Sequence, residues 1–464
     1  MTSDMEIPSG HVGNLTIDQE RKLKQFWTVL LQSWDLNFSG TDLSAPVTTG
    51  DAPKGHRRWF SLSRSQTQLT EETYSAIPPR LFATLKGLSA GPNEFNAIQE
   101  ILTKLSGDEL RCAYLSILKQ DHPDALCLRF LRAEDWNIPK GFIKFITALH
   151  WRVKEYKVDE KILAKGEQYA VEQSQKTDNF AEKKDAEGFV VQLHTGKGHF
   201  HGCDKWGRPI CIVRVRLHDP NGQTEKALDD YVIHCIEMVR LLQVPPVETM
   251  TLVFDLTSFS LSNWDFPPVK FIIKSFQENY PESLGAMIFY KAPWIFSGLW
   301  KLIQGILDPV VAAKVHFIND AKGLEKLIPR EHILKELGGE EDWEYEYIDP
   351  ESHENDKLRD ATTRDALLAE RKVLGDELFT TTTTWISTGQ CSERRNEIIE
   401  KLRDNYWRLD PYVRSRNILD RTAVIKEGGK IEFYPVTDQV QAREEPKAMN
   451  VEHIETAQST TISA

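Results

Sequence analysis

The feature that most constrains the fold is an alternation of short apolar strand patterns with amphipathic helix patterns between Gly188 and Ile318. Strand patterns lie at 188–196, 208–217, 250–256, 285–290 and 314–318, and helix patterns at 225–242, 269–280 and 296–307. Parallel strands need long crossover connections, which are usually helices, so this order favours an α/β fold. We therefore predict a mostly parallel sheet covered by helices.

A helical region precedes the predicted sheet. Almost all of residues 93–165 follow the helical period, so we assign 93–175 to a helical N-terminal lobe and 186–345 to the sheet domain. Residues 16–34 form a further amphipathic helix pattern with Thr16 as N-cap. Residues 36–56 are rich in Ser, Thr, Gly, Asp and Pro and are typical of a linker, which makes 1–57 an N-terminal extension.

The chain becomes acidic and polar beyond Trp343. Helix patterns at 365–378 and 392–408 predict a helical C-terminal extension over 346–427, while 428–464 show no pattern and are expected to be disordered. Basic and aromatic residues interleave over 392–426, but six acidic residues are interspersed among them. This mixture favours a salt-bridged, solvated helix that packs on the domain over a surface for anionic lipid.

Composition excludes several classes of protein. The 464 residues contain 57 Lys and Arg against 69 Asp and Glu, and the net charge of -12 argues against a nucleic-acid partner. Six scattered cysteines indicate reduced thiols and neither a disulfide framework nor a four-cysteine zinc site. No signal peptide and no run of 18 apolar residues is present, so we expect a cytoplasmic protein.

The common enzyme motifs are missing. The sequence has no GxxxxGK[ST], no GxGxxG after a strand and no GxSxG, which disfavours a nucleotide enzyme and a serine hydrolase. His194, His199, His201 and Cys203 cluster in a Gly-rich segment, but without a further ligand pair we expect no metal site there. Asp255 ends an apolar strand, where a turn-forming role is favoured over a catalytic one. We expect no cofactor and no enzymatic activity.

Residues 294–311, WIFSGLWKLIQGILDPVV, contain an unusually large apolar helix face. The apolar positions recur at three- and four-residue steps, and they are Phe296, Leu299, Trp300, Ile303, Ile306 and Leu307. Two interpretations stay open: an ordinary core helix, or a helix that covers a hydrophobic ligand and also touches a membrane.

The order and wording of these segments resemble the CRAL-TRIO lipid-binding family, which includes the yeast-type phosphatidylinositol/phosphatidylcholine transfer proteins. The similar motifs are LCLRFLRAEDWNIPKG, DKWGRPI, FDLTSFSLS, NYPESLGAMIFYKAPWIF, ILDPVVAAKVHFI and LGGEEDW, spread over residues 121–343. The resemblance implies a helical lobe followed by a lipid-binding lobe, whose sheet forms the floor of a pocket and whose gate helix, 296–307, closes it. The extensions resemble those of a fungal subgroup.

In phosphoinositide-binding members of that family, three motif positions handle the inositol phosphate, and here they hold Arg132, Glu282 and Lys314. Val311 departs from the pattern, which has a Thr there and so one more polar contact. An ordinary helix ion pair is the alternative role for Arg132. The resemblance implies binding and intermembrane transfer of a phospholipid of the phosphatidylinositol type without chemical turnover, with transient, peripheral membrane contact. A sterol or squalene-like ligand, or a regulatory protein-interaction module, are the alternatives.

Overall fold

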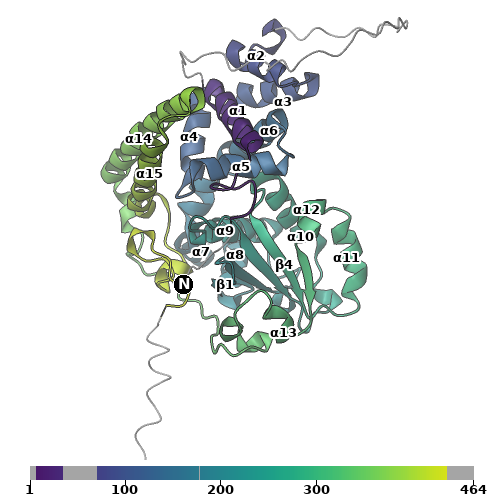
Figure 1. The fold of residues 1–464 in the computed structure, drawn as a ribbon. Helices are drawn as coiled ribbons and strands as arrows, with labels where there is room; N and C mark the ends of the chain where they lie inside the picture. The colour runs from purple at the N-terminus through teal and green to yellow at the C-terminus, as the bar shows by residue number, and fades with distance from the viewer. Residues whose placement is uncertain (1–6, 35–70, 177, 436–464) are drawn as a thin grey trace, which may run out of the picture.

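The computed structural model of the chain describes residues 7–34, 71–176 and 178–435. Figure 1 shows a helical lobe above a lobe built on a sheet, with two long helices of the C-terminal region along one side. The helical lobe contains α1 (Ile17–Ser33), η1 (Glu71–Tyr74), α2 (Pro79–Gly87), α3 (Pro92–Lys104), α4 (Gly107–Leu118), α5 (Pro123–Ala133), α6 (Ile138–His150) and the π-helical turns η2 (Trp151–Glu155) and η3 (Val158–Leu163).

A five-stranded sheet organises the second lobe. Its strands follow one another in the spatial order β1 (Gly198–Cys203), β2 (Pro209–Arg214), β3 (Met250–Asp255), β4 (Leu284–Tyr290) and β5 (Val315–Ile318). β1 is antiparallel to β2, and the other three neighbouring pairs are parallel. The predicted α/β class with a mostly parallel sheet is confirmed.

Helices connect these strands and cover the sheet. They are α7 (Gly166–Gln175), α8 (Phe180–Thr195), α9 (Glu225–Leu242), α10 (Phe266–Lys274) with the π-helical η6 (Ser275–Asn279), α11 (Phe296–Gln304), α12 (Pro309–Ala312) and α13 (Ala321–Leu324). Short 3-10 turns complete the lobe and its continuation: η4 (Val215–Leu217), η5 (Leu261–Asn263), η7 (Arg330–His332), η8 (Lys335–Leu337), η9 (Asp356–Arg359) and η10 (Glu427–Gly429).

The two faces of the sheet have different neighbours because side chains alternate along a strand. On β3, Leu252 and Phe254 belong to the apolar cluster that includes residues of α9, α10 and α11. Val253 between them belongs to a second cluster with Leu324 and Leu337 on the opposite face. The α11 side of the sheet is therefore separate from the side covered by α13 and the segment that follows it.

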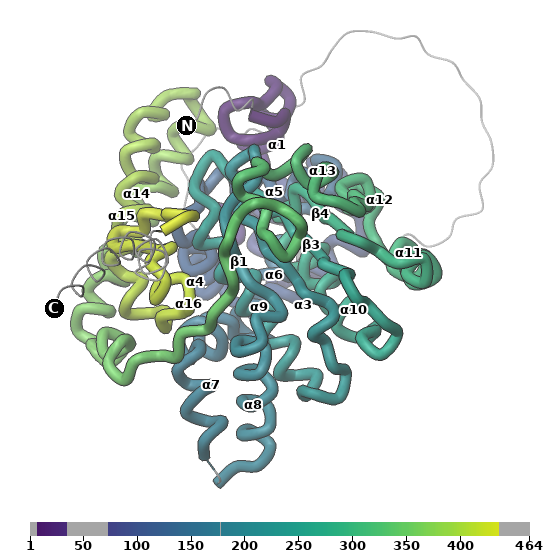
Figure 2. Tube along the Cα trace, turned by 90° about the horizontal axis from the view of Figure 1, so that it is seen from below, coloured from purple at the N-terminus to yellow at the C-terminus, as the bar shows by residue number. Residues whose placement is uncertain are grey.

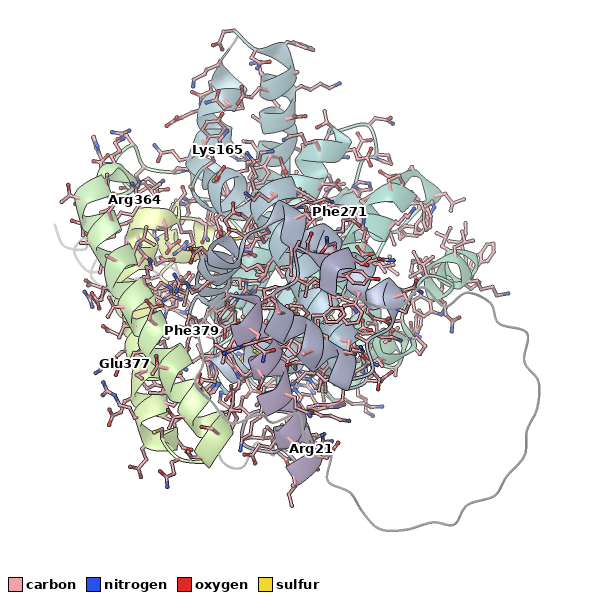
Figure 3. All side chains as sticks on the ribbon, turned by 90° about the horizontal axis from the view of Figure 1, so that it is seen from above. Arg21, Lys165, Phe271, Arg364, Glu377 and Phe379 are labelled. Carbon is pink, nitrogen blue, oxygen red and sulfur yellow. The ribbon has the colours of Figure 1, made fainter. Side chains whose placement is uncertain are left out.

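The C-terminal helices α14 (Ala361–Thr388), α15 (Ser392–Val413) and α16 (Ile418–Arg421) pack beside the helical lobe. Figure 3 shows Phe379 on the side of α14 that faces this lobe, and its ring lies 4.8 Å from that of Trp34 and 6.0 Å from that of Tyr114. α1 begins with the predicted N-cap, since the Thr16 hydroxyl accepts a hydrogen bond from the Gln19 amide. One apolar core thus joins α1, the lobe and the C-terminal helices.

The predicted strand at 188–196 is wrong, and the sheet begins at Gly198. These residues form the last turns of α8, which starts at the N-cap Asn179 and ends at Gly196 with φ of 59°. A Cβ on Gly188 would lie 2.9 Å from the Cβ of Ala227, so the glycine lets α8 pack closely on α9. Burial of Phe189 and Leu193 on one helix face overrides their strand-like pattern.

Two further boundaries differ from the sequence expectation. β2 ends at Arg214, and Val215 and Leu217, expected in the strand, lie in η4 instead. The threonine run FTTTTTW, which follows the helix pattern predicted at 365–378, is an interior part of α14. Four of its five hydroxyls donate to main-chain oxygens four residues earlier, as Thr380 does to Asp376, while packing on α15 and the lobe holds the helix.

The basic C-terminal segment is salt-bridged and packs on the domain, as predicted, but it is not wholly solvated. Arg408 pairs with Glu370 at the surface, whereas Arg395 and Arg414 are buried with carboxylate partners. The predicted linker at 36–56 and most of the tail predicted to be disordered lie outside the described residues. Within the described ranges, no helix has the length and apolar character needed to cross a bilayer.

Candidate functional site

An apolar cavity lies between the sheet and helices α9, α10 and α11. It contains about 1330 Å³ of empty space, counting the part open to solvent. The sheet contributes Phe200, Cys211, Val213, Leu252, Phe254, Met287 and Phe289. The helices contribute Leu228, Val232, Cys235, Ile236, Val239, Val269, Ile272, Ile273, Phe276, Phe296 and Ile303, and Leu307 follows α11. This lining suits a hydrophobic ligand.

The α11 residues expected to face a pocket divide into three groups. Phe296 and Ile303 are buried and line the cavity together with Leu307. Leu299 and Trp300 are half-buried against the same cluster; the Trp300 ring lies 5.3 Å from the rings of both Phe289 and Phe317.

Ile306 differs from the other five expected residues because it belongs neither to the cavity lining nor to the apolar cluster. α11 ends at Gln304, so Ile306 lies beyond the helix, is 38% exposed and does not line the cavity. The regular three- and four-residue spacing that placed it on the apolar face requires a helix that continues to Leu307, and the helix does not.

Exposed apolar side chains also occur on α11, just before it, on α12 and on β5. Trp294 is 85% exposed, Leu302 57%, Val310 52% and Phe317 49%. α11 lies at the edge of the molecule in Figure 2, on the side away from α14 and α15. We call these four residues the apolar edge. Such a group of exposed apolar residues is typical of a surface that meets a membrane or another protein.

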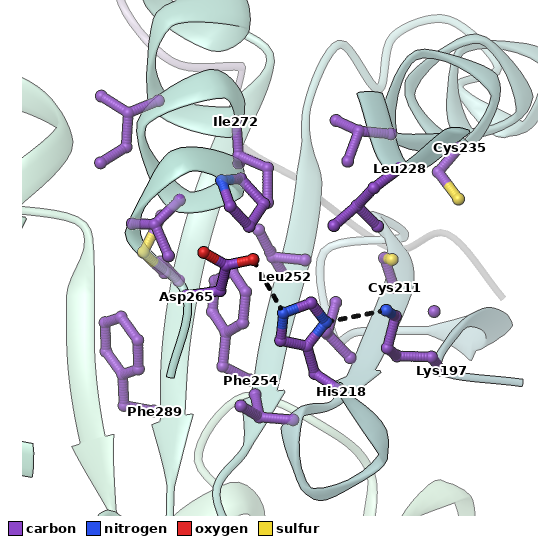
Figure 4. A pocket seen from close by; sticks show the side chains of 18 of the residues that line it. Lys197, Cys211, His218, Leu228, Cys235, Leu252, Phe254, Asp265, Ile272 and Phe289 are labelled. Atoms are coloured by element: carbon purple, nitrogen blue, oxygen red, sulfur yellow. Dashed lines mark hydrogen bonds and ion pairs between the residues drawn. The ribbon is translucent and has the colours of Figure 1, made fainter. Parts of the chain in front are cut away.

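A polar cluster of Lys197, His218, Asn263 and Asp265 interrupts the largely apolar lining of the cavity, and none of the four belongs to the sequence motifs. Figure 4 shows Lys197, His218 and Asp265 joined in a row. Lys197 Nζ lies 3.0 Å from His218 Nδ1, and His218 Nε2 lies 3.4 Å from Asp265 Oδ2. Lys197 immediately precedes β1, His218 follows η4, and Asp265 precedes α10, so only the folded chain brings them together.

The environment disfavours positive charge on this cluster. Burial lowers the pKa of Lys197 to about 8, although Asp265 and Asp219 act in the opposite direction. Burial and the neighbouring Lys197 charge also lower the pKa of His218. His218 is consequently neutral near pH 7, with Nδ1 able to accept a hydrogen bond from the Lys197 ammonium.

Glu282 and Lys314, two of the expected headgroup residues, lie together outside the cavity lining. Glu282 has a positive φ of 55° just before β4, and Lys314 directly precedes β5. Because β4 and β5 are parallel neighbours, both side chains meet at the same end of the sheet, and Lys314 Nζ lies 3.5 Å from Glu282 Oε2. Both are partly exposed, which leaves them accessible to a polar group.

Arg132, the third expected headgroup residue, is engaged elsewhere. Its guanidinium donates to Glu248 Oε2 at 3.0 Å and to the main-chain oxygen of Gly10 at 2.8 Å. The ion-pair alternative from the sequence therefore matches its contacts. The negative charge of Glu282 raises the pKa of Arg132, but burial, Glu248 and Arg129 have larger effects. Arg132 therefore lies near Glu282 without a hydrogen bond to it.

Arg129, one turn before Arg132 on α5, bonds more directly to the Glu282 turn. Its Nη1 donates to Ser283 Oγ at 3.0 Å and lies 3.5 Å from the Glu282 main-chain oxygen. Arg129 is buried, and its Nε has no hydrogen-bond partner. The three-residue spacing to Arg132 on one helix face was the signal in the sequence that could have identified it.

The histidine cluster before β2 has structural contacts. His199 Nδ1 lies 3.0 Å from the Gly196 main-chain oxygen, and His201 Nε2 lies 2.8 Å from Glu341 Oε1. Among the residues that the structure describes, no group of three or more His, Cys, Asp or Glu is placed to hold a metal ion. Asp255 forms the expected turn, since its Oδ1 accepts from the Thr257 amide at 3.0 Å.

Comparison with known proteins gives matches in both lobes. The CRAL/TRIO domain matches residues 193–339, and the CRAL/TRIO N-terminal domain matches residues 94–146. Among solved structures, the crystal structure of Sfh5 is similar with a TM-score of 0.36 and 19% identity, covering 48% of this chain and 73% of that chain.

Two fungal proteins are similar over nearly their whole length. A CRAL-TRIO domain-containing protein of Schizosaccharomyces pombe is 33% identical over 430 residues, covering 90% of this chain and 92% of that protein. The phosphatidylinositol transfer protein CSR1 of Eremothecium gossypii is 35% identical over 440 residues, covering 90% of this chain and 98% of that protein. The chain therefore belongs to the CRAL-TRIO family, as its motifs indicated.

Proposed function

We propose that the protein binds one phospholipid of the phosphatidylinositol type and transfers it between membranes or presents it there, without chemical turnover. The observation that carries this proposal is the apolar cavity of about 1330 Å³ between the sheet and α9, α10 and α11. Two acyl chains are long and apolar, and burying them in such a cavity releases their surface from water. The name of the phosphatidylinositol transfer protein among the relatives supports the same ligand class.

In this proposal the headgroup lies by the Glu282 and Lys314 pair. A Lys ammonium pairs with phosphate as a point charge, and a carboxylate accepts hydrogen bonds from sugar hydroxyls. Arg129, which bonds to the Glu282 turn, and Arg132 on the same helix add positive charge nearby. Engagement of Arg132 by phosphate would require exchange of its bonds to Glu248 and Gly10.

The apolar edge around α11 is the proposed membrane contact. Exposed Trp and Leu side chains partition into the interface between headgroups and acyl chains, where burial is favourable but modest for so few residues. The chain carries a net charge of -12, which opposes lasting attraction to anionic membranes. We propose a cytoplasmic protein that touches membranes transiently, and α11 as the gate through which the lipid passes.

An uncharged hydrophobe such as a sterol or a squalene-like molecule is the second candidate. The almost wholly apolar lining of the cavity favours it, since such a ligand needs few polar partners. In that case the Glu282 and Lys314 pair would not contribute to ligand affinity.

Lipid identification and transfer together test the proposal. The full chain, purified from cells and extracted with organic solvent, should yield one bound lipid per protein by mass spectrometry. It should also accelerate movement of fluorescent phosphatidylinositol between donor and acceptor vesicles, with the lipid recovered unaltered. A bound sterol or squalene with no phospholipid transfer would select the second candidate. Absence of any bound lipid together with absence of transfer would contradict both.

A further inference from the structure

The end of the cavity at β1 contains a buried ammonium group with unused donors. Lys197 is 6% exposed, and its main-chain oxygen accepts from the Arg214 amide at 2.7 Å, which anchors the residue to β2. Its side chain points into the cavity beside His218 (Figure 4). An ammonium group has three N–H donors, and His218 Nδ1 accepts one of them.

The other two donors of Lys197 have no hydrogen-bond partner among the described residues. Buried polar groups are rarely left without partners, because each unmade hydrogen bond costs free energy. The rest of the lining around this point is apolar, including Leu228, Leu252 and Phe254. A ligand atom in the cavity is therefore the acceptor that this position lacks.

The neighbours of Lys197 are held in place rather than free to turn away. Asn263 Nδ2 donates to the main-chain oxygens of both Arg216 and His218, at 3.2 Å and 3.0 Å, which fixes the segment that carries His218. His218 Nε2 faces Asp265 Oδ2 on its other side. His218 thus keeps Nδ1 toward Lys197. One hydrogen bond orients the ammonium, and its other two N–H groups point away from His218.

The charge of the cluster favours an anionic acceptor. The nearest carboxylate, Asp265, is separated from Lys197 by the His218 ring and is partly exposed, so solvent weakens its effect. Asp219 is exposed, and low-polarity surroundings raise the pKa of the Cys235 thiol to about 12, so the thiol carries no charge near pH 7. Among the residues that the structure describes, no carboxylate contacts the Lys197 ammonium directly.

We propose that Lys197 binds the carboxylate or phosphate end of an anionic lipid whose chain fills the cavity. This inference rests on the proposed lipid-binding function and adds a second polar site. The new site lies at β1, on one edge of the sheet, whereas Glu282 and Lys314 precede β4 and β5 toward the other edge. A lipid held here has its charged end inside the protein and its chain along the apolar lining. His218 and Asp265 position the ammonium.

A chain-matched ligand series tests the assignment. Oleate, oleyl phosphate and oleyl alcohol share one hydrocarbon chain and differ only at the polar end. Their affinities for the full chain are measured by displacement of the uncharged fluorophore N-phenyl-1-naphthylamine. The variants are Lys197→Met, which keeps the length without the charge, Lys197→Arg, which keeps the charge, and Lys322→Met, which removes an exposed charge on α13, as the control.

We expect Lys197→Met to weaken oleate or oleyl phosphate at least about tenfold, as loss of a charge-assisted hydrogen bond does, and to leave oleyl alcohol within about twofold. Lys197→Arg should retain most of the anion affinity, and Lys322→Met should leave the affinity for all three ligands unchanged. Whichever of the two anions responds more strongly identifies the preferred end group. Thermal unfolding of Lys197→Met establishes that the variant is folded.

Two results would overturn the inference while leaving lipid binding intact. One is an equal loss of all three ligands in a folded Lys197→Met protein, which would give Lys197 a structural role. The other is wild-type affinity for oleyl alcohol equal to that for both anions. If none of the three ligands displaces the fluorophore from the wild-type chain and the chain transfers no phospholipid, both the proposed function and this inference are contradicted.

Discussion

Arg395 of α15 forms a buried, two-bonded ion pair with Asp124 of α5, which is 271 residues away in the sequence. Arg395 Nη1 lies 2.7 Å from Asp124 Oδ2 and Arg395 Nη2 lies 2.5 Å from Asp124 Oδ1. Trp27 of α1 donates to the same carboxylate at 2.7 Å. Burial alone would raise the pKa of Asp124, but Arg395 lowers it to about 2. This pair joins the C-terminal extension to the helical lobe.

Removing one member of this pair should destabilise the whole protein. Arg395→Met leaves the Asp124 charge buried without its cation, which costs about 3–5 kcal/mol in comparable cases. Arg394 on the same helix is a matched control because it is largely exposed, and its pairs with Glu377 and Glu397 are surface pairs. Arg394→Met should change the free energy of unfolding by less than about 1 kcal/mol. Urea unfolding followed by circular dichroism measures both, and equal effects would contradict the assignment.

The Lys314 site predicts selective loss of one ligand class. Lys314→Ala removes the cation beside Glu282 and should cost about 2 to 5 kcal/mol of binding free energy for phosphatidylinositol, as loss of a partner in a charged contact does. Loading of an uncharged hydrophobe should not change. Lys322→Ala, which removes an exposed charge on α13, is the control. Lipid loading from vesicles, read by mass spectrometry, would reject the assignment if both ligand classes were lost equally.

Anion binding at Lys197 should depend on pH. Burial lowers the pKa of Lys197 to about 8, and the free protein loses the charge as the pH rises through this value. Affinity for oleate should therefore be constant between pH 6.5 and 7.5 and then fall by up to about tenfold per pH unit above 8. The Cys235 thiol, whose pKa is raised to about 12, stays uncharged in this range, and neutral His218 cannot compensate.

Two comparisons distinguish this titration from other effects of pH. In Lys197→Arg the fall should disappear, because an arginine stays charged throughout. Binding of oleyl alcohol to the wild-type protein should show no such fall. A fall of the same size for oleyl alcohol would mean that the pH acts on the fold rather than on the contact between Lys197 and the anion.

Contact with a membrane should depend on the outer side of α11. Leu302 is 57% exposed, so Leu302→Glu should weaken vesicle binding and lipid transfer while changing stability by less than about 0.5 kcal/mol. Leu368 is a matched control because it is 43% exposed and belongs to α14, which lies on the other side of the molecule from α11 (Figure 2). Leu368→Glu should leave vesicle flotation and transfer unchanged. Equal loss in the two variants would remove α11 as the contact surface.

Opening of α11 should be visible in amide hydrogen exchange. α11 has only nine residues and lies at the edge of the molecule, whereas β3 is paired on both sides. Exchange in α11 should therefore be faster than in β3 and should change when vesicles are added. Trp300→Glu places a charge against Phe289 and Phe317 and should loosen the helix as well. An α11 protected as strongly as β3 in both conditions would make it an ordinary core helix.

The sequence by itself determined the class of fold and most of its elements. The helix at 225–242 is observed with the same bounds, and the strands at 250–256 and 285–290 differ by one residue each. These elements bury one or both faces along their whole length, so their periodicity is clear. The prediction of a strand at 188–196 is wrong because its apolar residues suit either a strand or a helix, and packing against α9 favours the helix.

Tertiary structure alone decided where the polar side chains act. The motifs identified Glu282 and Lys314, and parallel pairing of β4 and β5 placed them 3.5 Å apart. Arg132 carried the same motif signal, yet Glu248 and Gly10 occupy its donors. Lys197, His218 and Asp265 share no local pattern, since each lies at the end of a different element. Their common environment exists only after the sheet, η4 and α10 enclose the cavity, because burial and unpaired donors are properties of the folded chain.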